Sequence, residues 1–311
     1  MDRVRQGGAG FVLIVAALPG LAGASPAAGA ARLVAPGVVS TAANDYNFAI
    51  SRTDDVAVFA TSAARFEGAR IHIGRFRGDR FDELPALHFQ RDGYRYSDPW
   101  LTPDGTMLLF ISDQPHPGRA ADAKDLDIWQ VHLRDGRWGE PQRLGGEINS
   151  RSDELGPEVH AGVLYFNSSR PGGPSKTAIY RAAIGDGLAA QVEALPAAIN
   201  RGDHQGDFTL SADGMTAAFW SMRTGETEKL DLYLARRVGD GWGEAEKLPA
   251  PFSSPGNDFT PFFAADGKTL YFASTRTLDE DTAGAALSNG LSNVFWATLP
   301  AAWHTRPGSK R

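Results

Sequence analysis

Acidic residues recur at one place in this chain, ahead of an apolar stretch that itself recurs, and their type and spacing could do chemistry. Carboxylates gathered on one surface can hold a peptide terminus or a sugar, and they are the oxygen ligands that Ca²⁺ prefers. Two carboxylates in different environments can also act as acid and base on a glycosidic bond. The acids are Asp45, Asp98, Asp153, Asp207 and Asp258, with Asp203 and Glu154 nearby.

Arginines that follow the second apolar stretch of three copies give these acids a structural alternative. Arg170, Arg223 and Arg276 each come shortly after one stretch, and each could pair with an acid of its own copy or the next. Repetition in every copy favours such a structural role. If the acids form a site instead, we predict a binding site made of the five aspartates and these three arginines. A catalytic pair within it is the third hypothesis, and it needs two acids whose pKa values diverge.

A repeat of about 50 residues organises nearly the whole chain. Its marker is an apolar strand that ends in Phe and a small residue, often with Arg soon after. The marker residues are Phe59, Phe110, Phe166, Phe219 and Phe272, which are separated by 51, 56, 53 and 53 residues. A repeat of this length that contains several short strands is typical of a β-propeller blade.

Each copy contains four strand-like parts. An apolar stretch ends in an Asp-Gly turn, as in 208–214 (FTLSADG), and the Phe-marked strand follows. An alternating strand such as 230–237 (LDLYLARR) comes third, and a weaker edge strand such as 242–250 (WGEAEKLPA) comes fourth. We predict an all-β, five-bladed β-propeller whose first strands line the central channel, with the acids in the loops that enter these strands. Six blades would need a further copy, which we do not find.

The two ends of the repeat region predict how the ring closes. The fifth copy stops after its third strand, at 293–299 (NVFWATL), while 32–40 (RLVAPGVVS) resembles the fourth strand of other copies. We therefore expect the N-terminal strand to complete the last blade, because an open ring would leave sheet edges unpaired. The prediction is a single propeller domain over 31–300, followed by a polar C-terminal tail over 301–311.

The first thirty residues differ from the rest. Arg3 and Arg5 precede a short apolar run at 11–18, and small residues with possible A-x-A cleavage sites follow at 22–24 and 28–30. This order predicts a secretory signal peptide over 1–30 and a mature protein that is periplasmic or secreted. The alternative, a membrane anchor, is disfavoured because the run is short and interrupted by Gly and Pro. We expect no transmembrane segment after cleavage.

Composition excludes several classes of function. The formal net charge is −6 without runs of like charge, which argues against nucleic acid because phosphate binding needs a clustered basic surface. The chain has no cysteine, no G-x-S-x-G motif and no metal-ligand spacing among its seven histidines. We expect no cofactor, with Ca²⁺ on the acids as the one candidate ion. The tryptophans, Trp220 among them, are expected to pack in the core or at hairpins; Trp100, on a first strand, is the exception.

The repeat units resemble the WD40-like β-propeller repeats of the TolB type, found in bacterial envelope proteins. The resemblance depends on 97–113 (SDPWLTPDGTMLLFISD), 125–131 (DLDIWQV), 136–159 and 164–173, and it covers about 32–300. The chain departs from TolB in having no separate N-terminal α/β domain, and no OmpA-like domain follows. The resemblance implies a binding or scaffold module of the cell envelope, with an envelope protein or glycan as partner. A carbohydrate-active hydrolase that uses paired carboxylates is the alternative.

Overall fold

The computed structural model describes residues 30–51, 55–119, 125–145, 147–184, 191–223, 229–278 and 285–303. The predicted signal peptide therefore lies almost wholly outside the described residues, as does most of the predicted tail. The first three residues of that tail form a 3₁₀ turn, η3 (Ala301–Trp303), and the guanidinium of Arg236 lies over the Trp303 ring, 4.9 Å from its centroid. No helix among these residues is long and apolar enough to cross a bilayer.

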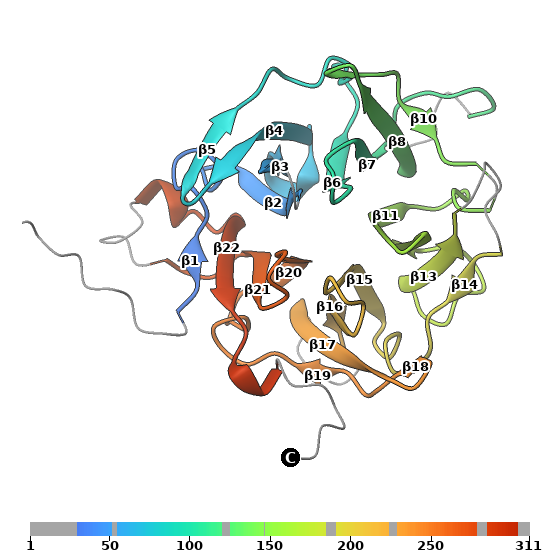
Figure 1. Ribbon diagram of the computed structural model, residues 1–311, viewed down its shortest axis with the longest axis vertical. Helices are drawn as coiled ribbons and strands as arrows, with labels where there is room; N and C mark the ends of the chain where they lie inside the picture. The colour runs from blue at the N-terminus through green and yellow to red at the C-terminus, as the bar shows by residue number, and fades with distance from the viewer. Residues whose placement is uncertain are drawn as a thin grey trace, which may run out of the picture.

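Five antiparallel sheets stand around a central axis, which confirms the predicted five-bladed propeller and excludes six blades (Figure 1). Blade 1 comprises β2 (Asn44–Ile50), β3 (Val56–Ser62), β4 (Arg70–Arg77) and β5 (Arg80–Glu83). Blade 2 comprises β6 (Tyr96–Leu101), β7 (Met107–Ser112), β8 (Asp127–Arg134), β9 (Arg137–Trp138) and β10 (Gln142–Arg143). Blade 3 comprises β11 (Glu154–His160), β12 (Val163–Ser168), β13 (Ala178–Ala183) and β14 (Glu193–Ala194). Blade 4 comprises β15 (His204–Leu210), β16 (Thr216–Met222), β17 (Asp231–Val238), β18 (Gly241–Trp242) and β19 (Glu246–Lys247). Blade 5 comprises β20 (Asp258–Phe263), β21 (Thr269–Ser274), β22 (Asn293–Thr298) and β1 (Arg32–Leu33).

The N-terminal strand closes the ring as predicted. Strand β1 pairs with β22, with Arg32 opposite Trp296 and Leu33 opposite Phe295. The ladder continues for one more bond, from the Val34 N–H to the Val294 carbonyl at 2.9 Å. The paired segment is shorter than the predicted 32–40 strand. Blade 5 therefore gains its outer strand from the opposite end of the chain, and its β22 edge is covered.

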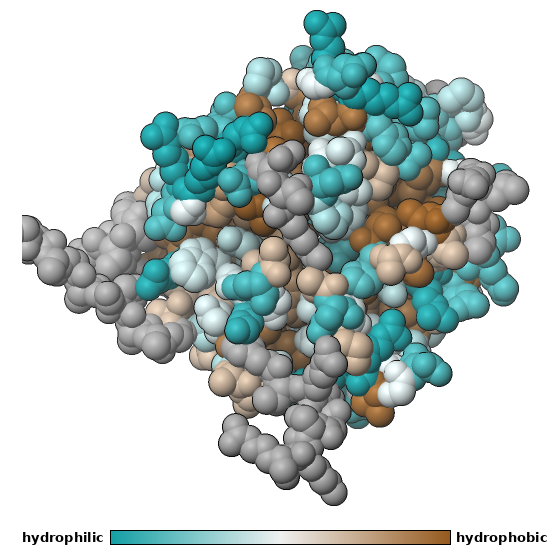
Figure 2. Space-filling view, in the orientation of Figure 1, coloured by the Kyte–Doolittle hydropathy of each residue, from teal (hydrophilic) through white to brown (hydrophobic). Residues whose placement is uncertain are grey.

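The apolar core lies between neighbouring blades. Every marker Phe is at most 2% exposed, and Phe110 of blade 2 packs in one cluster with Val58 and Ile73 of blade 1. Similar clusters join each of the other neighbouring pairs of blades. Hydrophilic side chains cover much of the rim, and hydrophobic surface appears in separate patches (Figure 2). The repeated Phe is thus the residue by which each sheet stacks on the next.

The innermost strand of every blade carries a β-bulge, and this feature positions the site. One residue at each bulge has a positive φ between 47° and 55°. Four of the five are not glycine, and residues held in this conformation cost energy and gather at functional sites. All five line the narrow part of the central channel, so each blade presents one side chain or glycine there. The residues are Asn47, Asp98, Gly156, Asp207 and Thr260.

Candidate functional site

The predicted acids occupy different positions, not one equivalent position in each blade. Asp98 and Asp207 are bulge residues, whereas Asp45 and Asp258 lie two residues before the bulge residue of their own blades. Asp153 lies one residue before β11 begins. The expectation that every acid lies in the loop entering its strand is therefore wrong for four of the five, which lie on the strands themselves. The bulge residue faces the channel, while the residue two places earlier faces its own loop.

Asp258 connects three parts of its blade. Its carboxylate accepts hydrogen bonds from the Ser254 N–H at 2.7 Å and from the Ser274 hydroxyl at 2.6 Å. The Arg276 guanidinium lies 3.0 Å away and also stacks over Phe272. The Asp258 side chain is fully buried. A buried carboxylate that is fully hydrogen-bonded in this way holds the entering loop against the second strand.

Blade 3 repeats this arrangement with Glu154 in place of aspartate. Glu154 accepts hydrogen bonds from the Ser150 N–H at 2.7 Å and the Ser168 hydroxyl at 2.8 Å, and Arg170 lies 3.3 Å away. Its neighbour Asp153 accepts a bond from the Leu126 N–H at 2.9 Å. Two structural acid–arginine pairs therefore exist. The pair in blade 3 contains Glu154, whereas the acid predicted for the site in that blade was Asp153.

Blades 1 and 4 carry incomplete versions of this acid–arginine arrangement. Asp45 accepts bonds from the Thr41 N–H at 2.6 Å and the Thr41 hydroxyl at 2.9 Å, and burial raises its pKa to about 6. In blade 4 the acid is replaced by Gln205, whose carbonyl oxygen accepts a bond from the Gly202 N–H at 2.9 Å. Arg223 stacks over the Tyr233 ring at 4.5 Å, and burial lowers its pKa. Five equivalent Asp–Arg pairs do not exist.

A cavity of about 310 Å³ opens at one mouth of the channel. The bulge residues Asn47, Asp98, Asp207 and Thr260 line its inner part. Of the described residues, the lining includes none of Asp45, Asp153, Asp258, Arg170, Arg223 or Arg276. The other polar or charged lining residues are Arg65, Arg95, Ser97 and Asn167, and the apolar and aromatic ones are Tyr46, Phe66, Ala69, Ile111, Leu126, Leu155, Trp220, Leu230 and Phe259.

Aromatic rings form one wall of this mouth cavity. Phe66 meets Tyr46 edge to face, with ring centroids 5.0 Å apart, and it lies 6.5 Å from Phe259 in the same kind of geometry. Phe66 is held there by η1 (Ala64–Phe66), in which Arg65 and Phe66 both have a φ of 61°. Its side chain remains 46% exposed. A large aromatic side chain held at a strained turn and left exposed is expected at a binding surface.

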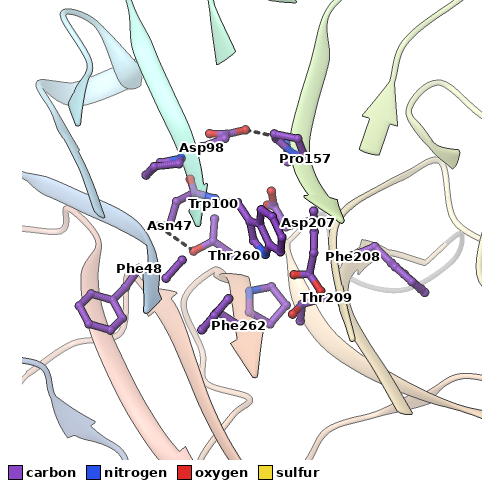
Figure 3. Close-up of a pocket in the computed structure, with 15 residues that line it drawn as sticks. Asn47, Phe48, Asp98, Trp100, Pro157, Asp207, Phe208, Thr209, Thr260 and Phe262 are labelled. Atoms are coloured by element: carbon purple, nitrogen blue, oxygen red, sulfur yellow. Dashed lines mark hydrogen bonds between the residues drawn. The ribbon is translucent and has the colours of Figure 1, made fainter. Parts of the chain in front are cut away.

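Two carboxylates meet at the floor of the mouth cavity, on either side of Gly156. Asp98 accepts hydrogen bonds from the Gly156 N–H at 2.9 Å and the Ser97 hydroxyl at 2.8 Å. Asp207 accepts one from the Trp220 indole N–H at 2.5 Å, and a Cβ placed on Gly156 would lie 2.5 Å from its other oxygen. Figure 3 shows both acids at the channel, with the Trp100 ring beside Asp207 and Phe262 lower in the view. The pair therefore shares one small space with unequal partners.

Burial and proximity change the protonation of this pair. Burial, followed by the charge of Asp98, raises the pKa of Asp207 to about 8. Burial also raises the pKa of Asp98, against the opposing hydrogen bonds from Ser97 and Gly156. The two acids therefore titrate together, and Asp207 retains its proton at neutral pH. Such a pair can accept hydrogen bonds, bind a cation or transfer a proton.

The channel is narrowest at the level of the bulge residues, which include the acid pair. The space at the level of the bulges is only about 40 Å³, and Trp100 and Phe262 are among its lining residues. A second cavity, of about 400 Å³, lies beyond it and is lined by Glu158, His160 and apolar residues. Within the described chain, no group of three or more His, Cys, Asp or Glu side chains is arranged to hold a metal ion. The mouth cavity is thus a pocket whose floor is the acid pair.

The number of residues between each acid and its marker Phe is a signal for the acid pair in the sequence. Asp98 and Asp207 each lie 12 residues before their marker Phe, whereas Asp45 and Asp258 lie 14 residues before theirs. Because side chains alternate along a strand and a bulge changes that alternation, this spacing separates acids of different role in blades 1, 2, 4 and 5. It does not do so in blade 3, where Glu154 also lies 12 residues before Phe166 but has the role of Asp258. The aromatic wall gave no such signal. Trp220 packs against the core clusters as expected, but it also lines the cavity and bonds Asp207.

Comparisons with known proteins support the fold. No protein-family model and no curated protein matches the sequence. An α-L-arabinofuranosidase from Lactobacillus brevis is similar in structure, with a TM-score of 0.56, 12% identity, and coverage of 85% of this chain and 92% of that one. A protein described as a glycoside hydrolase also gives 0.56 at 12% identity, covering 92% and 94%. TolB from Acinetobacter baumannii gives 0.48 at 16% identity; the match covers 82% of this chain and 55% of TolB. At these identities the likeness establishes the propeller fold alone.

Substituting Gly156 tests how closely Asp207 approaches the backbone between the two acids. Gly156→Ala is expected to destabilise the protein by about 2–4 kcal/mol, because a φ of +55° strains alanine and its Cβ would meet Asp207 and Asn167. Gly162→Ala is the matched control, since Gly162 has a φ of +77° with nothing within 4 Å, and about 1–2 kcal/mol is expected there. Urea unfolding measures both. Equal losses would contradict the close approach of Asp207 to Gly156.

Proposed function

We propose that this propeller is an exported binding module of the cell envelope, and that it binds a protein segment whose apolar end enters the mouth cavity. The observation that carries the proposal is a cavity with aromatic and aliphatic walls and two carboxylates as its floor. Its volume of about 310 Å³ suits one side chain and the backbone next to it. Recovery of the protein only from the cytoplasm would contradict the envelope location.

The walls favour a peptide over the other ligands predicted for the acids. A sugar needs a polar partner for most of its hydroxyls, and the cavity offers mainly apolar surface, from residues such as Ile111, Leu126, Leu155 and Leu230. Ca²⁺ takes six to eight oxygen ligands, and two carboxylates of the described residues reach this space. A peptide with an apolar end fits both the walls and the floor.

Peptide binding can be measured by the fluorescence of Trp220 and by thermal shift. Tripeptides with a large apolar residue at one end, with free or acetylated amino termini, are expected to raise the melting temperature, since they bind the folded state. Phe66→Ala is expected to weaken their binding about tenfold. Val238→Ala is the control, because Val238 is also exposed but lies outside the cavity. Shifts with saccharides or Ca²⁺ and none with any peptide would overturn the proposal.

A second candidate function is hydrolysis of a glycosidic bond. The observation that favours it is the different surroundings of the two acids: Trp220 bonds Asp207, whose pKa of about 8 would suit a general acid, while Ser97 and Gly156 bond Asp98. Two solved structures of similar fold are named as an arabinofuranosidase and a glycoside hydrolase. Release of nitrophenol from aryl glycosides, lost in Asp207→Asn, would replace the binding function with this one. No release from a broad panel would exclude it for those sugars.

A further inference from the structure

We propose that the mouth cavity recognises a primary ammonium group attached to an apolar body, and that on a peptide this group is the free amino terminus. Asp98 and Asp207 would hold the ammonium, and the aromatic wall of Tyr46, Phe66 and Phe259 would cover the first side chain. The inference rests on the proposed function and names the chemical group that the site selects. The acid pair and the aromatic wall support this inference by separate physical arguments.

The acid pair offers hydrogen-bond acceptors that suit an ammonium. An ionised carboxylate has about four lone-pair positions, and an ammonium brings three donors. The protein uses two positions on Asp98, through Ser97 and Gly156, and on Asp207 it uses the bonds from Trp220 and the Asn47 side chain. Acceptor positions therefore remain on both acids for a ligand in the cavity. Charge-assisted bonds of this kind are the strongest that a small polar group can make.

The aromatic wall is complementary to the same group. The face of an aromatic ring attracts a cation, and its body covers the neighbouring apolar carbon atoms. Trp220 contributes to both features, because its ring lines the cavity while its indole N–H bonds Asp207. An uncharged apolar ligand would displace water from the remaining acceptor positions of the two carboxylates and would offer them no donor, which is costly. The combination of walls and floor thus selects an amine over a neutral ligand of the same shape.

Other charged groups near the pair leave the floor negative. Arg95 lines the cavity, but its Nε lies 3.0 Å from an Asp113 oxygen and its backbone N–H bonds the other. Arg65 lies at the exposed turn η1, where it can meet carbonyl oxygens of a bound peptide. Glu158 lies further along the channel, and its carboxylate accepts a bond from the Leu210 N–H at 2.8 Å. Tyr46 stays neutral, because burial raises its pKa to about 12.

Binding of an ammonium is expected to release a proton. Asp207 of the free protein holds a proton because burial and the neighbouring Asp98 raise its pKa, and a cation between the two acids favours the ionised form of Asp207. Affinity should therefore rise about tenfold per pH unit from pH 6 towards pH 8, for an amine that stays charged over that range. Alkyl amines, with a pKa of about 10.4 in the lysine side chain, meet this condition.

Calorimetry with paired probes tests the inference. The probes are 2-phenylethylamine, Phe-Gly-Gly and the N-acetyl form of each, titrated into the mature protein in two buffers of different ionisation enthalpy. 2-Phenylethylamine is expected to bind with release of about one proton below pH 8. Phe-Gly-Gly should release about one proton only below about pH 7, because its α-amino group has a pKa of about 7.7–8.0. The acetylated forms are expected to bind about tenfold to hundredfold more weakly. Asp207→Asn is expected to abolish the proton release. Asp203→Asn, an exposed acid outside the cavity, should bind like the parent protein.

The outcomes separate this inference from the proposed function. Equal binding of free and acetylated Phe-Gly-Gly overturns the ammonium inference and leaves peptide binding standing. Binding of 2-phenylethylamine without binding of Phe-Gly-Gly supports the ammonium chemistry and overturns the peptide as its source. Absence of binding by all four probes overturns both. If Asp207→Asn does not fold, Asp98→Asn carries the same expectation of lost proton release.

Discussion

Replacing Asp207 with Asn is expected to stabilise the protein while it removes ligand binding. The native pKa of Asp207 is raised from 3.8 to about 8, so between about pH 4 and pH 8 the unfolded chain has released a proton that the native protein retains. Stability contributed by this group is therefore complete below about pH 4 and is lost as the pH rises through 8. Asparagine carries no such cost, because its amide is uncharged at every pH in this range.

The size of this gain depends on pH. We expect the free energy of unfolding to rise by about 1–3 kcal/mol at pH 8, well below the full conversion of the pKa shift, because the cavity admits water. Urea unfolding of both proteins at pH 4, 6 and 8 should give a difference that grows with pH. Asp203→Asn is the control and should follow the parent curve. A difference in the free energy of unfolding that stays the same at pH 4, 6 and 8 would show that folding does not raise the pKa of Asp207.

A gain in stability on removing an acid would identify a site, because proteins keep unfavourable groups where function needs them. The same logic separates Asp207 from Asp258, which have the same residue type and lie two positions apart on the innermost strands of neighbouring blades. Asp207 has no cationic partner among the described residues and its pKa is raised, whereas Asp258 pairs with Arg276 and two serines. Opposite effects of equivalent substitutions would be hard to explain by any model in which all five acids are alike.

The fold could be predicted because its signals are repeated. The period of the marker Phe, the Asp-Gly turns and the likeness of 32–40 to a fourth strand each appear in the sequence, and each follows from the way sheets stack around an axis. The outer strands are shorter than expected: the outer part of blade 2 consists of the two-residue strands β9 and β10. Pro141 lies between them and has no N–H to give to β8.

The candidate site could be predicted only in part, because it depends on what the repeat does not share. Asp98 and Asp207 were among the predicted residues, but a bulge that reverses the direction of one side chain is not visible in composition or period. Phe66 depends on η1, which occurs in blade 1 and packs across to Phe259 of blade 5. Contacts between blades that are distant in sequence have no local signal.

Replacing Asp258 with Ala is expected to have the opposite effect to Asp207→Asn. The change removes the acceptor for the Ser254 N–H and the Ser274 hydroxyl and leaves the half-buried Arg276 without its carboxylate. Loss of one partner of a buried ion pair costs about 3–5 kcal/mol, and we expect a loss of that size in urea unfolding. Asp258→Asn should cost less, because its amide oxygen still accepts one of these bonds.

A double variant shows whether the loss comes from the stranded arginine. Asp258→Ala combined with Arg276→Met removes both charges, and Met can cover Phe272 and Phe295, over which the guanidinium now lies. We expect the double variant to recover about 1–3 kcal/mol of the single loss, since an uncompensated charge costs more than a missing pair. Peptide binding should persist in each folded variant, because Asp258 is outside the mouth cavity. Loss of binding at full stability would instead make Asp258 part of the site and would refute the division of the acids into two roles.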